Sequence, residues 1–143
     1  MDDFPSALMA LHRELRGIYA ATARRFGLTA QQIELLCLLG DRAPSSGELA
    51  VMLGCDKTNV TGMVDRLERR ELLTRAADRN DRRVARLSLT AEGEALGGQV
   101  RAAFSEAVAE RWGSLDAADL GAIARLAAPR SSLPEQDHRR QTG

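Results

Sequence analysis

One segment of the chain places small polar side chains on one face of a predicted helix, with basic residues beside them. These residues are Lys57, Thr58, Asn59, Thr61, Gly62 and Arg66. Hydroxyl and amide groups hydrogen-bond to the edges of DNA bases, Lys and Arg suit phosphate, and glycine allows close approach. We therefore predict a surface that reads duplex DNA, with Thr58, Asn59 and Thr61 at base edges. The alternative is an ordinary solvated helix face.

A second segment is strongly basic, although the formal net charge of the chain is zero. Between positions 75 and 86, five arginines face two aspartates, which leaves a local excess of positive charge. These residues are Arg75, Asp78, Arg79, Asp81, Arg82, Arg83 and Arg86. A projecting basic hairpin can insert arginine into the narrow minor groove, where negative potential is focused. The alternative is a solvated hairpin whose charges prevent edge-to-edge aggregation.

The first segment requires a helix pair to present it. An apolar stripe at helical spacing predicts one buried face on a helix that begins after Asp56, a good N-cap. This stripe consists of Val60, Met63, Val64 and Leu67. Upstream, Ala50 is small enough for a second helix to cross it, and Gly54 can adopt the positive φ of a tight turn. The spacing of Ala50, Gly54 and Val60 is typical of a helix-turn-helix.

The second segment requires a strand pair. Residues 73–76 read as a short extended stretch. Ala85, Leu87 and Leu89 alternate with polar residues, which predicts a strand with one buried face. Residues 78–83 form a polar tip between the two strands. One hairpin after three helices is the pattern of a wing.

The remaining segments are predicted to be helical. A stripe at alternating steps of four and three marks a first helix over about 5–26, and it consists of Phe4, Leu8, Leu11, Leu15 and Ile18. Its partner is either the core of the same chain or a second subunit. Thr29 begins a buried helix, Thr90 caps a long one, and Pro129 stops the last. We expect residues 131–143 to form a disordered tail.

Composition supports a mainly α-helical fold with a small β-hairpin wing. Hydrophobic residues make up 44% of the chain and aromatic residues only 3%, so an aliphatic core of packed helices is favoured. No nucleophile–base pair, phosphate-binding glycine loop or metal-ligand spacing is present in the sequence, so we expect neither an enzyme nor a cofactor. The N-terminus lacks a signal-peptide pattern and no apolar run is long enough to span a bilayer. We therefore expect a cytoplasmic protein without a membrane partner.

Together these motifs resemble the MarR family of multiple-antibiotic-resistance regulators, over about residues 5–129. The most specific matches are 53–61 and 64–73, completed by the wing 78–83 and by the segment 87–93. Glu71 departs from the pattern, because the family commonly has glycine there. Glutamate lacks glycine's easy access to positive φ, which leaves the shape of the turn into the wing open.

The resemblance implies one domain over 1–130, in which 28–89 form a winged helix-turn-helix and helices 5–26 and 91–129 form a dimerisation lobe. It implies a homodimer that binds pseudo-palindromic operators in double-stranded DNA, usually as a repressor. It also implies that Arg83 enters the minor groove, that Asp81 orients it, and that Arg82 reaches the DNA backbone. Arg79 is a further contact candidate at the same tip.

Many relatives bind a small anionic or phenolic effector between the two lobes. The candidates for such a cleft are His12, Arg16 and Tyr19, with Arg13 and Cys37 beside them. His12 and Tyr19 could equally be surface or dimer-contact residues. Cys37 reads as a small core residue. Cys55 directly precedes a helix N-terminus, which favours a thiolate, so a redox role is a hypothesis.

The sequence therefore favours a dimeric, sequence-specific DNA-binding transcriptional regulator. The alternative is a winged-helix module used for protein–protein contact. The zero net charge allows this alternative, whereas the basic wing and the small polar helix face argue against it.

Overall fold

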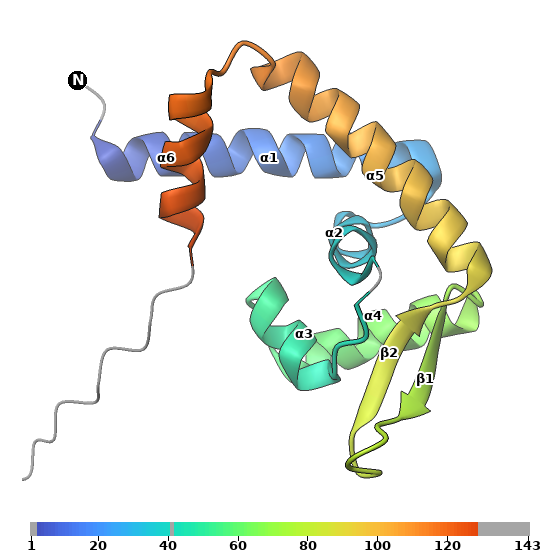
Figure 1. Ribbon diagram of the computed structural model, residues 1–143. Coiled ribbons are helices and arrows are strands. Elements are labelled where there is room, and N and C mark those ends of the chain that lie inside the picture. Colours follow the sequence, from blue (N-terminus) through green and yellow to red (C-terminus); the bar gives the residue numbers. More distant parts are fainter. Residues whose placement is uncertain (1–2, 41, 129–143) are drawn as a thin grey trace, which may run out of the picture. The chain divides into compact units, whose positions relative to one another are not determined.

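The computed structural model describes residues 3–40 and 42–128 (Figure 1). Its helices are α1 (Phe4–Phe26), α2 (Ala30–Leu39), α3 (Ser46–Leu53), α4 (Lys57–Arg69), α5 (Ala91–Trp112) and α6 (Ala117–Ala127). Its strands are β1 (Leu73–Ala77) and β2 (Ala85–Leu89). The predicted tail 131–143 and the predicted stop at Pro129 lie outside the described residues. The chain divides into two compact units, Met1–Arg111 and Trp112–Gly143.

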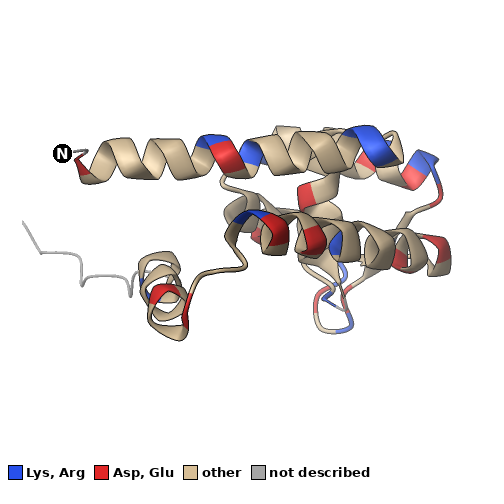
Figure 2. Cartoon of the chain, turned by 90° about the horizontal axis from the view of Figure 1, so that it is seen from above, with Lys and Arg blue, Asp and Glu red and all other residues tan. Residues whose placement is uncertain are grey.

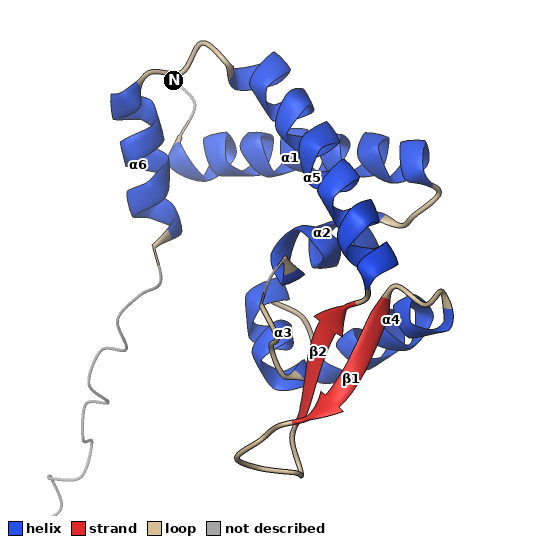
Figure 3. Cartoon of the chain, turned by 45° about the vertical axis from the view of Figure 1, so that its right-hand side comes forward, coloured by secondary structure: helices blue, strands red, loops and turns tan. Residues whose placement is uncertain are grey.

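The predicted fold class is confirmed: the first unit is built from helices, with a two-stranded antiparallel hairpin as its β-structure (Figure 3). The predicted helix starts at Thr29 and Thr90 are also confirmed. The Thr29 hydroxyl accepts from the Gln32 amide at 3.1 Å, while the Gln32 side chain accepts from the Thr29 amide at 3.0 Å. The Thr90 hydroxyl accepts from the Gly93 amide at 3.0 Å. Each cap satisfies an amide that the helix leaves unpaired.

The core of the first unit has two parts, and α2 contributes to both. Leu35 and Leu39 pack in a cluster with α3, α4 and the hairpin. Ile33 and Leu36 pack in a second cluster with the end of α1 and with Val100 of α5. Helix α2 is apolar nearly all round because it lies between the two clusters.

The predicted helix-turn-helix is confirmed as α3, a turn at Gly54, and α4. Gly54 has φ +63°, the left-handed conformation that the spacing required. Val60 is fully buried, and Ala50 is packed against the same cluster. Asp56 occupies the N-cap position of α4 with extended backbone, but its side chain makes no capping hydrogen bond. Its position was therefore predicted correctly, whereas the expected side-chain cap is absent.

The hairpin pairs Leu73 with Leu89 and Ala77 with Ala85. The amide of Leu87 donates to the Pro44 carbonyl at 2.9 Å, so β2 is also bonded to the segment before α3. The predicted alternation of buried residues holds only in part. Leu87 is fully buried, but Ala85 is exposed, because it lies at the tip end of the strand, where the core no longer covers it.

Glu71 adopts the conformation that glycine would adopt. Its φ is +58°, the one positive value outside glycine among the described residues. The Leu72 amide donates to the Leu67 carbonyl at 3.0 Å, and the Thr90 hydroxyl donates to the Glu71 carbonyl at 2.7 Å. These bonds hold the turn in the left-handed region, a conformation that costs a non-glycine residue about 1 kcal/mol. The turn at position 71 is therefore left-handed although glutamate replaces glycine there.

The second unit is described over residues 112–128. Its helix α6 begins with a reciprocal cap, in which the Asp116 carboxylate accepts from the Asp119 amide at 2.8 Å. Leu120, Ile123 and Leu126 are all exposed, so this helix carries an apolar face.

The start of α5 depends on the absence of a side chain at Gly93. An added Cβ would lie 1.9 Å from the Leu72 carbonyl oxygen. We expect Gly93→Ala to lower the free energy of unfolding by about 2 kcal/mol or more, because the turn backbone would have to move. Gly98→Ala is the matched control: it lies on the same helix with no atom near, and should raise stability by about 0.5 kcal/mol through helix propensity. Urea denaturation of both variants checks this, and equal stabilities would contradict it.

Candidate nucleic-acid interface

The predicted reading surface lies on the exposed side of α4. Its four buried residues face the core, as predicted, and are Val60, Met63, Val64 and Leu67. The candidate contacts Lys57, Thr58, Asn59, Thr61 and Arg66 are all exposed. Gly62 is half-buried and has no atom within 4 Å of the position of an added Cβ. No side chain projects from the helix at this position, so a partner can approach the backbone closely. The geometry thus leaves the N-terminal half of α4 free to approach a partner.

Thr61 already uses its proton inside the helix. Its hydroxyl donates to the Lys57 carbonyl at 3.0 Å. The lone pairs and the methyl group of Thr61 stay available. This favours acceptance of a hydrogen bond from a base amino group, or contact with a thymine methyl.

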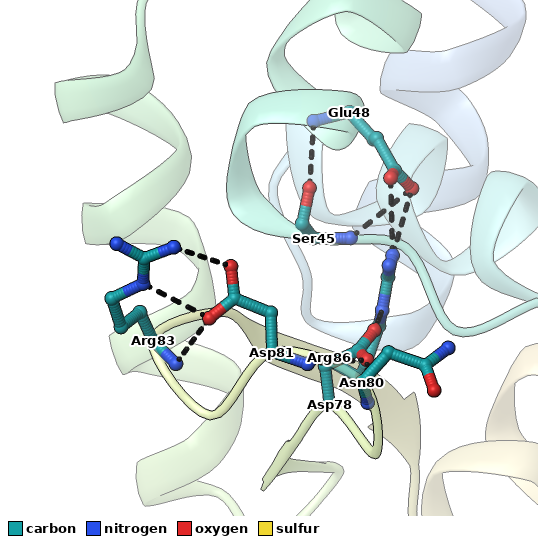
Figure 4. Close-up of polar contacts among 7 residues, drawn as sticks. All are labelled: Ser45, Glu48, Asp78, Asn80, Asp81, Arg83 and Arg86. Atoms are coloured by element: carbon teal, nitrogen blue, oxygen red, sulfur yellow. Dashed lines mark hydrogen bonds and ion pairs between the residues drawn. The ribbon is translucent and has the colours of Figure 1, made fainter.

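At the hairpin tip, Asp81 orients Arg83 (Figure 4). The Asp81 carboxylate accepts from Nε of Arg83 at 3.1 Å, from Nη2 at 3.2 Å, and from the Arg83 amide at 3.1 Å. These hydrogen bonds also lower the pKa of Asp81, so the carboxylate stays ionised at neutral pH. The Arg83 side chain is nevertheless 90% exposed. The pair therefore presents a preoriented guanidinium to solvent.

The loop that carries this pair is folded around Asp78. Its carboxylate accepts from the Asn80 amide at 2.6 Å and from the Asp81 amide at 3.2 Å. It also accepts from Nε of Arg86 at 2.6 Å. The Asn80 amide and Arg86 both lower the pKa of Asp78. Sequence reasoning counted Asp78 as a charge and missed this role, although Asp is common in turns because its side chain accepts from the backbone amide two residues on.

Three of the five hairpin arginines form ion pairs within the chain, which corrects the simple charge count; besides Arg83 with Asp81, they are Arg75 and Arg86. Arg75 on β1 pairs with Asp65 and with Glu68 of α4. Arg86 on β2 pairs with Asp78 and with Glu48 of α3. Sequence spacing could not reveal the long-range partners, because Glu48 is 38 positions from Arg86.

The positive charge that remains is concentrated at the tip. Within residues 3–40 and 42–128, Arg79 and Arg82 are exposed and take part in none of the ion pairs. Together with Arg83 they form the basic part of the hairpin loop, and acidic residues lie next to them (Figure 2). The structure thus brings Arg79, Arg82 and Arg83 together on one loop, at the end of the hairpin away from α5 (Figure 3).

Comparison with known proteins identifies the family. The model of the MarR family matches residues 28–85. The chain is 41% identical to the transcriptional repressor NicR of Pseudomonas putida over 70 residues, a match that spans 48% of this chain and only 44% of NicR. It is 30% identical to the homoprotocatechuate degradative operon repressor of Escherichia coli over 108 residues, which are 74% of this chain and 72% of that repressor. The chain belongs to the MarR family.

This MarR-family protein is also similar to a solved structure, that of BpsR of Bordetella bronchiseptica, whose description names the regulation of its DNA binding by 6-hydroxynicotinic acid. The two chains are 28% identical, with a TM-score of 0.72. The match covers 87% of this chain and 90% of that one.

The candidate effector residues do not gather in one place. His12, Arg13 and Arg16 line a shallow groove of about 400 Å³ along α1, with Leu8 and Met9. Tyr19 lies elsewhere: its ring stacks on Phe104 of α5 at a centroid distance of 4.7 Å. Burial raises the pKa of Tyr19, so its phenol stays protonated.

A second groove involves Cys37, which sequence reasoning placed in the core. Cys37 is half-buried and lines a depression of about 440 Å³ together with Arg42 and Arg101. Arg101 donates to the Leu36 carbonyl at 3.3 Å, so its guanidinium is held against α2. Sequence spacing could not point to Arg101, because its partner is a backbone atom 65 positions away.

The structure also bears on metals and membranes. Among the described residues, no three His, Cys, Asp or Glu side chains are grouped so that they could hold a metal ion. In the same part of the chain, no helix combines the length and hydrophobicity of a membrane span.

The two thiols are expected to react at different rates. Burial raises the pKa of Cys37, so less of its thiolate is present at neutral pH. The Cys55→Ser protein retains Cys37 and should therefore react with a thiol probe more slowly than free cysteine does. The redox hypothesis for Cys55 requires the opposite: Cys37→Ser protein should react faster than free cysteine. A rate equal to or below that of free cysteine would exclude it. Stopped-flow absorbance with a disulfide probe measures both rates.

Proposed function

We propose that this MarR-family protein is a homodimeric, sequence-specific DNA-binding transcriptional regulator that acts in the cytoplasm as a repressor. One observation carries the proposal: a helix-turn-helix leaves the polar N-terminal half of α4 exposed, and the adjoining hairpin presents Arg83 held by Asp81. The alignment with NicR spans less than two thirds of that repressor, so the activity is inferred from these residues rather than transferred from it.

In this proposal α4 enters the major groove. Thr58, Asn59 and Thr61 contact base edges there, because recognition helices read DNA with their N-terminal residues. Lys57 and Arg66 bind phosphates on either side, and Gly62 permits close approach.

The hairpin tip contacts the neighbouring minor groove. Arg83 enters it, while Asp81 fixes the guanidinium before binding and so reduces the entropy lost on contact. Arg82 and Arg79 bind the backbone. An Arg that is already oriented suits a narrow groove better than a flexible Lys would.

The second subunit is placed on the exposed apolar surface of α1. Phe4, Leu8, Met9 and Leu11 are all exposed, although residues 4–12 of α1 carry no Lys, Arg, Asp or Glu. An apolar surface of this kind on a terminal helix favours a helical interface. A two-fold dimer would set its two α4 helices about 34 Å apart, one turn of DNA, and so match a pseudo-palindrome.

A small phenolic or anionic effector is part of the proposal. The arginines on the grooves of α1 and α2 are suited to a carboxylate, and BpsR is described as regulated by an aromatic acid. His12 and Arg16 stay candidates as effector contacts, whereas Tyr19 would act only through its stack on Phe104.

The alternative function is a winged-helix module for protein–protein contact. It predicts no preference for any DNA sequence. The curated relatives are transcriptional repressors, and no enzymatic role is proposed for this chain.

Removal of the minor-groove arginine should weaken specific DNA binding. We expect Arg83→Ala to reduce affinity for an operator duplex about tenfold and to lower the slope of log affinity against log salt by about one, because one phosphate-region contact is lost. Thr61→Ala should instead relax discrimination at one base pair, by about 1–3 kcal/mol. Arg24→Ala, an exposed arginine at the end of α1, is the control.

The measurement is fluorescence anisotropy with the chain's upstream intergenic DNA and a scrambled duplex, each over a salt series. Equal binding of wild-type protein to both duplexes, at every salt concentration, would count against an operator in that DNA. If duplexes selected from a random library also bind no better than the scrambled one, the protein-contact module becomes the better explanation.

The dimer proposal is tested on the apolar surface of α1. Leu8→Glu places a charge in the predicted interface and should shift the protein to monomers in sedimentation velocity. Val51→Glu makes the same kind of change at a side chain that is 84% exposed on α3, and should leave the dimer intact. A wild-type protein that sediments as a monomer at all concentrations, or a dimeric Leu8→Glu variant, would contradict this interface.

A further inference from the structure

One arginine joins two elements of the interface that are far apart in the sequence. Nε of Arg86 donates to Asp78 at 2.6 Å, and its Nη1 donates to both carboxylate oxygens of Glu48, at 3.0 and 3.2 Å. Glu48 belongs to the first turn of α3, and Asp78 belongs to the hairpin loop. The guanidinium thus bridges the helix-turn-helix and the wing (Figure 4).

Each of the two carboxylates is itself fixed to the backbone of its own element. The Glu48 side chain accepts from the Ser45 amide at 3.4 Å, and Ser45 caps the Glu48 amide in return at 3.2 Å. Asp78 accepts the amides of Asn80 and Asp81. A continuous set of hydrogen bonds therefore runs from the start of α3 to the residue that orients Arg83.

We propose that Glu48 and Arg86 are positioning residues for the wing: acting through Asp78, they hold the loop that presents Arg83 in a fixed place relative to the helix-turn-helix. This inference rests on the proposed DNA-binding function. The roles that it gives to Glu48 and Arg86 differ from those that their charges alone would predict.

Charge alone makes the opposite prediction for Glu48. A carboxylate near DNA repels phosphate, so its removal should strengthen binding and steepen the salt dependence. Arg86 would count as one more cation for phosphate, and Lys would serve nearly as well. Positioning demands instead the fork of an arginine, because a single ammonium cannot reproduce the planar geometry that links Asp78 and Glu48.

The test compares Glu48→Gln and Arg86→Lys with wild-type protein by anisotropy on the same intergenic and scrambled duplexes. Gln also fits the capping position, so Glu48→Gln keeps the start of α3, and Arg86→Lys keeps the net charge. We expect both variants to bind the intergenic duplex about fivefold more weakly, with a shallower salt slope. Glu110→Gln and Arg24→Lys make the same changes at exposed sites outside the wing and should bind like the wild type.

Double variants show whether the effect passes through the tip. Because Arg86 acts on DNA by placing the loop that carries Arg83, Arg86→Lys should cost less affinity in an Arg83→Ala background than in the wild-type background. Additive losses would overturn the proposal, and so would unchanged or tighter binding of Glu48→Gln.

A readout without DNA separates this inference from the proposed function. The ¹H–¹⁵N heteronuclear NOE of the Asn80 and Arg83 amides should fall in both variants, while the amides of α2 stay as rigid as in the wild type. If wild-type protein shows no preference for any duplex, the DNA-binding proposal fails and the NOE alone decides the positioning role. Unchanged NOE values at the tip would overturn it.

Discussion

The burial of α2 on two sides is the constraint on which the rest of the first unit depends. Leu35 and Leu39 anchor the helix-turn-helix and the hairpin, whereas Ile33 and Leu36 anchor α1 and α5. Both clusters share one rigid helix, so neither can shift without disturbing the other. The helix that would read DNA and the helix with an unpartnered apolar surface are thereby built around the same ten-residue segment.

Around this core, the arginines of the hairpin have two roles. Some bind the hairpin to the helices, and others are exposed to solvent. Arg75 and Arg86 are bound to carboxylates of α4, α3 and the loop, and they fasten both strands of the hairpin. Within the part of the chain that the structure describes, Arg83 is held by its neighbour Asp81 alone and stays exposed. The same residue type thus serves as a structural clamp at the base of the wing and as a presented cation at its tip.

Much of the fold followed from the sequence because local signals agreed with one another. Gly54 between two helices, the caps at Thr29 and Thr90, and the change of period after Leu72 each depend on nearby residues. The family pattern further indicated the pairing of Asp81 with Arg83. Long-range polar contacts were not predictable: no spacing rule links Glu48 to Arg86, or Arg101 to the Leu36 carbonyl. The sequence left the conformation of Glu71 open, because the local bond from the Leu72 amide is completed by a tertiary bond from the Thr90 hydroxyl, 19 positions away.

Internal pairing of arginines also bears on how such a protein would find its site in a genome. Binding to random DNA scales with the number of phosphates that free cations neutralise. Here the chain is neutral overall and pairs three of its five hairpin arginines with its own carboxylates. On the proposed function, such a protein would spend less time on the competing non-specific sites of a chromosome than one whose hairpin arginines were all unpaired. Fewer copies per cell then suffice to keep an operator occupied.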